Sequence, residues 1–65
     1  MIDPKTLTDS DIGRWIEYRG SGGERELGKL KSWNDKVIFV VFKCDEQWDR
    51  FEDFTGEAVY PADLF

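Results

Sequence analysis

The sequence predicts a small, mainly β domain built as a sheet or barrel of four to five antiparallel strands. Residues 27–33 alternate as a strand does and lead into an Asn34-Asp35 turn. Six apolar residues of high β propensity, Val37 to Phe42, follow this turn. The chain has 65 residues, enough for one domain with a small core, so its three Trp, two Tyr and five Phe must supply much of the buried area.

The N-terminal residues 1–11 are predicted to form a leader with one helical turn. Thr8 precedes Asp9 and Asp11, and acidic residues are favourable at the start of a helix. Gly13 is expected to end the turn. A first strand then follows over residues 14–19.

Alternation in the first strand places Ile16 and Tyr18 toward the core. Trp15 then points outward, or into a second small cluster under the leader. The glycine-rich loop 20–23 joins this strand to a second one over residues 24–33. In that second strand Leu30 points inward, and Gly28 predicts a bulge or bend.

The third strand is apolar on both faces. One face is expected to lie on the core, and the other needs a second cover. Three covers remain open: the leader, the segment after Cys44, or a partner molecule. The two faces are formed by Ile38, Val40 and Phe42 on one side and by Val37, Phe39 and Val41 on the other.

The pattern changes after the third strand. Trp48, Phe51 and Phe54 recur at a spacing of three, which fits a short helix or 3-10 turn, and we expect a helical insertion near residues 46–53. A short closing strand is predicted at residues 57–60. A 3-10 turn that opens at a proline is expected over residues 61–64.

The net charge of −5 is concentrated at one end of the chain. Residues 1–44 contain eight Lys and Arg against seven Asp and Glu, whereas residues 45–65 contain Arg50 against seven acids. This acidic part would repel a phosphate backbone. Two interpretations remain open: a solvated face that keeps the domain soluble, or a face that meets a basic partner.

The N-terminal residues show no signal peptide, and no apolar run is long enough to span a membrane. A single cysteine excludes an internal disulfide, so a cytoplasmic location is expected.

The residue types argue against catalysis and against a metal centre. The chain has no histidine to act as a base, and its one cysteine cannot form a zinc site. Cys44 lies beside acids that raise the pKa of a thiol, which predicts an inert structural cysteine. Asp45, Asp49 and Asp53 would share one side of a helix. Three interpretations of this side remain open: a solvated face, a protein-binding face, and a metal or active site. We therefore expect no enzyme activity and no cofactor.

The order of these elements resembles an SH3-like barrel of the Tudor type. The resemblance covers residues 12–65 and rests on four segments: residues 13–18, 28–33, 37–42 and 60–64. The local sequences of residues 32–36 and 48–56 also resemble those of a group of small bacterial and phage proteins of unassigned function. The resemblance implies a partner-binding module with an aromatic platform supplied by Tyr18, Trp33 and Phe39.

Together these observations predict a non-catalytic protein-interaction module, of the accessory kind that bacteria and phages encode. Its aromatic and acidic surface would be centred on Trp33 and Trp48 with Asp49 and Asp53, and would bind a protein or peptide, in particular a basic one. The alternative is a regulator of a nucleic-acid system, acting either as an acidic mimic of DNA or by weak binding of nucleic acid. That binding would use Trp33 with Lys29, Lys31 and Lys36. The oligomeric state stays open.

Overall fold

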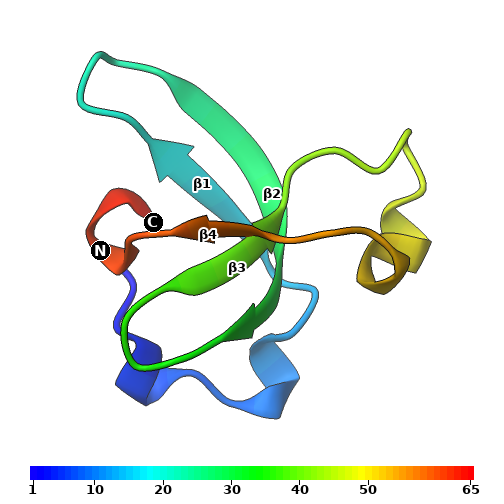
Figure 1. Cartoon of the computed structure of the whole chain (residues 1–65), viewed down its shortest axis with the longest axis horizontal. Helices are drawn as coiled ribbons and strands as arrows, with labels where there is room; N and C mark the ends of the chain where they lie inside the picture. Colours follow the sequence, from blue (N-terminus) through cyan, green and yellow to red (C-terminus); the bar gives the residue numbers. More distant parts are fainter.

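The computed structural model describes all 65 residues and has a single four-stranded antiparallel sheet (Figure 1). The strands follow one another in the order β1-β2-β3-β4, and the sheet is open. The predicted mainly β class is thus confirmed. In chain order the elements are the 3-10 turns η1 (Pro4–Thr6) and η2 (Asp9–Asp11), the strands β1 (Trp15–Arg19), β2 (Arg25–Trp33) and β3 (Ile38–Val41), the 3-10 segment η3 (Trp48–Asp53), the strand β4 (Glu57–Val59) and the 3-10 turn η4 (Pro61–Asp63).

β2 is the longest strand and pairs with β1 on one side and with β3 on the other. The pairing with β1 runs without interruption past Gly28, so the bulge predicted there is wrong. The irregularity lies between Leu30 and Ser32, in the pairing with β3. Gly28 has another reason to be glycine, because a Cβ atom there would lie 2.6 Å from Cγ1 of Val40. Close approach of two strands thus requires this residue.

The main core lies on one face of the sheet and contains side chains from the N-terminal residues, from β1 to β3 and the residue after β3, and from the C-terminal residues. The inward positions predicted for Ile16 and Leu30 are confirmed, since both side chains are buried. Tyr18 and Trp33 are half-buried and pack against this core. The buried members are Ile2, Ile16, Leu30, Ile38, Val40, Phe42 and Leu64.

A second cluster lies on the opposite face of β3, where Val41, Cys44 and Phe51 are buried together. Trp48 and Phe54 are half-buried and pack against it, so the aromatic spacing of three does mark one side of a 3-10 segment. The segment after Cys44 is therefore the second cover of β3. This explains why β3 is apolar on both faces.

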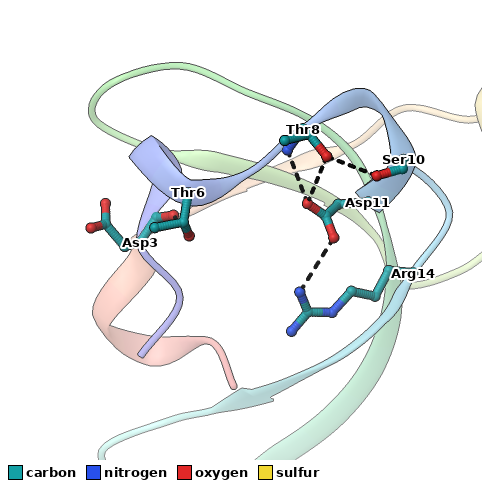
Figure 2. A network of polar contacts seen from close by, with 6 residues as sticks. All are labelled: Asp3, Thr6, Thr8, Ser10, Asp11 and Arg14. Atoms are coloured by element: carbon teal, nitrogen blue, oxygen red, sulfur yellow. Dashed lines mark hydrogen bonds and ion pairs between the residues drawn. The ribbon is translucent and has the colours of Figure 1, made fainter.

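The leader forms two 3-10 turns, η1 and η2, where one turn was expected. In η2 the carboxylate of Asp11 accepts a hydrogen bond from the backbone N–H of Thr8 at 2.9 Å and lies 3.6 Å from the guanidinium of Arg14 (Figure 2). Gly13 follows with a φ of 88°, a left-handed conformation that glycine adopts without strain. The leader is anchored on the main core by Ile2, which is buried.

The C-terminal residues lie beside the free edge of β1. Leu64 forms an isolated bridge with Tyr18, and Phe65 exchanges two backbone hydrogen bonds with Glu17, at 2.9 and 3.0 Å. The N–H of Ile2 also donates to the carbonyl of Pro61, which brings the two chain ends together (Figure 1). None of the helical segments has the length and apolar character needed to cross a bilayer.

Candidate binding site

A pocket of about 320 Å³ lies between the β1–β2 hairpin and β4. Its lining combines aromatic side chains with carboxylates and includes no lysine or arginine. The lining residues come from β4 and the residue after it, from the β1–β2 hairpin, from the chain just after β3 and from η4. They are Tyr18, Glu26, Phe42, Glu57, Ala58, Val59, Tyr60 and Asp63.

The β1–β2 pairing sets one wall of this pocket. Tyr18 and Glu26 are direct cross-strand partners, so their side chains emerge on the same face of the sheet. The ring of Phe42, just after β3, lies 6.1 Å from the ring of Tyr18 at an interplanar angle of 73°. This edge-to-face arrangement is a favourable aromatic geometry and gives the pocket a firm apolar floor.

The opposite wall comes from β4 and the turn after it. Tyr60 has 71% of its surface exposed, although it is one of the largest side chains in the protein. Asp63 belongs to η4, whose fold is held by the backbone N–H of Asp63 donating to the carbonyl of Tyr60 at 3.0 Å. An exposed aromatic ring and a carboxylate are thus held at the rim by one turn.

The carboxylates of the pocket have no basic partner within the protein. Glu26, Glu57 and Asp63 take part in none of the ion pairs. Those pairs join Arg14 to Asp11, Arg19 to Glu17 and Arg50 to Asp53, and none of these residues lines the pocket. Aromatic faces and carboxylates both attract cations, so the arrangement is suited to hold an ammonium or guanidinium group.

Arg19 lies close to the pocket in sequence but is held on the other face of β1. Its guanidinium hydrogen-bonds the carboxylate of Glu17 and lies 4.4 Å from the centre of the Phe65 ring. The same hydrogen bond lowers the pKa of Glu17, and the charges of Arg19 and Arg25 contribute in the same direction. The nearby positive charge is therefore directed away from Tyr18.

The structure separates the residues that the sequence predicts as one binding surface. Tyr18 lines the pocket. Trp33 packs against the main core and borders a shallower hollow of about 220 Å³ near η2, and Phe39 is half-buried on β3. Trp48 belongs to the second cluster. Trp33 and Trp48 thus pack against different clusters.

The two predicted aspartates of that surface, Asp49 and Asp53, are exposed on η3. Asp53 pairs with Arg50 at 3.3 Å. Neither residue lines the pocket.

Trp15 is half-exposed, and its ring centre lies 4.7 Å from that of Trp48. The second small cluster that was one option for Trp15 therefore exists, but it lies with η3 and not under the leader.

The lysines of β2 fasten η3 to the sheet. The ammonium of Lys29 donates to the carbonyl of Trp48 at 3.3 Å and lies 5.1 Å from the centre of the Trp15 ring. The ammonium of Lys31 donates to the carbonyl of Phe54 at 2.5 Å. Two of the three lysines considered for nucleic-acid binding are thus engaged inside the protein.

Sequence reasoning missed most of the pocket, namely Glu26, Phe42, Glu57, Tyr60 and Asp63. Counting outward from the glycine loop 20–23 pairs Tyr18 with Arg25, one residue away from its observed partner Glu26, so the register of the hairpin was not predictable from the loop. The return of β4 beside this hairpin depends on tertiary packing and has no local signal.

Comparison of the chain with models of protein families, with curated proteins and with solved structures gives no match.

Proposed function

We propose that the protein is a non-catalytic interaction module that binds a basic segment of a partner protein in the pocket between the β1–β2 hairpin and β4. One observation carries the proposal. Three carboxylates without basic partners surround a cavity with aromatic walls, and no cationic side chain of the chain itself fills it. A lysine or arginine side chain of a partner complements this cavity in both charge and shape.

We also propose that the fold is an SH3-like, partly open barrel related to the Tudor type. The arrangement of β1 supports this proposal, because β1 has β2 on one side and residues 64–65 on the other. Residues 64–65 follow β4 and η4 in the chain, so their pairing with β1 brings the end of the chain back to the first strand, as closure of a barrel requires. The gap that remains between β4 and the hairpin is where the pocket lies.

The proposed binding is tested by NMR titration with a short blocked peptide of alternating threonine and valine that has one central lysine. The comparison peptide replaces that lysine by norleucine, which keeps the aliphatic chain and removes the charge. We expect chemical-shift changes at Tyr18, Phe42 and Tyr60 with the lysine peptide, and much smaller ones with norleucine. Equal binding of both peptides contradicts the recognition of a cation.

A pair of double variants gives a control of matched charge. Replacing Glu57 by Gln together with Asp63 by Asn is expected to weaken binding by about 1.4- to 5-fold per carboxylate, because exposed ion pairs contribute about 0.2–1 kcal/mol each. Replacing Asp49 and Asp53 by Asn removes the same net charge from η3. This second variant is expected to bind like the wild type.

The acidic segment around η3 supports a second candidate function, regulation of a nucleic-acid system by mimicry of DNA. Asp45, Glu46, Asp49 and Glu52 are exposed there and take part in no ion pair. The two double variants separate the candidates. A basic DNA-binding protein that is captured through mimicry would lose affinity in the Asp49 and Asp53 variant and keep it in the Glu57 and Asp63 variant.

A further inference from the structure

We infer that the basic partner segment binds in an extended conformation, as an additional strand along the free edge of β4. This inference rests on the proposed function and specifies how the pocket is used. In this mode the protein recognises the backbone of the partner segment together with one cationic side chain, and not a cation alone.

The lining of the pocket follows the edge of β4 and not one of its faces. Residues 57–60 all line the pocket, although they follow one another in the chain. Successive residues of a strand direct their side chains to opposite faces of the sheet. The three consecutive residues of β4, 57–59, border one cavity only where that cavity runs along the strand's edge.

The backbone at this edge has hydrogen-bonding groups without partners. β4 pairs with β3 through Glu57, Ala58 and Val59. No hydrogen bond joins the backbone of these residues to any other part of the chain. In an antiparallel strand about half of the N–H and C=O groups point away from the paired neighbour, so β4 presents a template for a further strand.

The side chains along this edge leave room for a strand. Ala58, in the middle of β4, is small and exposed. Glu57 precedes it, Tyr60 lies two residues after it, and Tyr18 lies across the pocket on the hairpin. A lysine on an added strand would therefore direct its side chain between the two tyrosines, while the peptide backbone follows β4.

Charge selects a basic peptide over a second copy of this chain as the occupant. A second copy that used the same edge would bring its own Glu57 and Asp63 beside those of the first copy. Like charges at such a contact oppose association. A basic extended segment instead neutralises the three pocket carboxylates and satisfies the free backbone groups, the mode known as strand addition.

The test uses backbone methylation of the same lysine-centred peptide. A strand uses only one of its two edges for pairing, so one pair of alternate N-methyl groups blocks strand addition and the shifted pair does not. The two methylated peptides are matched controls for each other. We expect one of them to bind about tenfold more weakly than the parent peptide and the other to bind like it.

A second measurement reports on the protein itself. Backbone amide exchange within residues 57–59 is expected to slow when the parent peptide binds, and cross-strand proton contacts are expected between the peptide and β4. If both methylated peptides bind like the parent and exchange at β4 is unchanged, strand addition is overturned while the proposed pocket function stands. If the parent peptide does not bind to the full chain, both are overturned. Concentration-dependent dimerisation that protects the same amides overturns the choice of occupant.

Discussion

Gly28 shows how one residue sets the distance between two strands. A Cβ atom at this position would lie 2.6 Å from Cγ1 of Val40 and 2.8 Å from the carbonyl oxygen of Val41. The backbone oxygen cannot move aside without disturbing the sheet. We expect Gly28→Ala to lower the free energy of unfolding by about 1–3 kcal/mol, the usual cost of overpacking, as measured by urea denaturation.

The control for this prediction is Gly22→Ala in the hairpin loop. A Cβ atom there meets only the flexible side chain of Glu24, and Gly22 is exposed. Its unfolding midpoint is expected to stay close to that of the wild type. Equal unfolding midpoints for Gly28→Ala and Gly22→Ala would show that the two strands can move apart to accommodate a Cβ atom at position 28 without loss of stability.

Glu17 and Arg19 give a prediction that depends on pH. The hydrogen bond from Arg19 lowers the pKa of Glu17 below its usual value of 4.5. The ionised carboxylate therefore favours the folded state above that value, and this contribution is lost as the pH falls through the lowered pKa. We expect Arg19→Gln to raise the pKa of Glu17, as followed by NMR titration of the side-chain carboxyl carbon.

The matched control is Arg14→Gln, which removes the same charge beside Asp11. It is expected to leave the titration of Glu17 unchanged. A Glu17 titration that is the same in Arg19→Gln and the wild type would contradict the assigned cause.

At the scale of one element, η3 is attached to the sheet by polar as well as apolar contacts. Lys29 donates to a carbonyl of η3 and lies over the rings of Trp15 and Phe51. We expect Lys29→Met to loosen η3 and to expose the buried Cys44. Because a hydrogen bond contributes about 1 kcal/mol net, a thiol reagent should then label Cys44 about fivefold faster than in the wild type.

Lys36→Met is the control for this experiment, because Lys36 is exposed at the turn between β2 and β3 and its ammonium has no partner. Labelling of Cys44 in this variant is expected to proceed at the wild-type rate. Unchanged labelling in Lys29→Met would mean that apolar packing alone holds η3.

The same element shows how far local pattern predicts structure. The spacing of Trp48, Phe51 and Phe54 is a local signal, so both the 3-10 segment and its buried side were predictable. The bonds from Lys29 and Lys31 were not, since each lysine reaches a carbonyl about twenty residues away in the chain. Every residue has a backbone carbonyl, so the sequence does not indicate which carbonyl a lysine will bind. From the sequence alone, the two lysines are therefore expected to be free.

The binding site follows the same division. The sequence placed Tyr18 on the core side of the first strand, and the structure leaves it half-buried there, at the wall of the pocket. Tyr60 and Asp63 join the pocket because β4 and η4 return beside the hairpin. That return is decided by burial of Leu64 and by the bonds of Phe65 to Glu17, which are contacts between distant parts of the chain.

The whole molecule depends on this C-terminal return. Leu64 is fully buried in the main core, whereas Leu27 on β2 is 59% exposed. We expect Leu64→Ala to lower the free energy of unfolding by about 2–5 kcal/mol, which is most of the stability of so small a domain. Leu27→Ala is expected to lower it far less. Urea denaturation followed by circular dichroism compares the two. Similar losses for both leucines would show that the C-terminal residues are not integral to the fold.

The free edge of β4 also bears on how the protein behaves in concentrated solution. Unpaired strand edges promote sheet-to-sheet aggregation, and charged side chains beside such an edge act as gatekeepers against it. Glu57 and its neighbouring acids therefore have a protective effect that is independent of any ligand. Neutral replacements at these positions, which weaken recognition, also remove the repulsion that keeps the molecules apart, so these variants should be studied at low protein concentration.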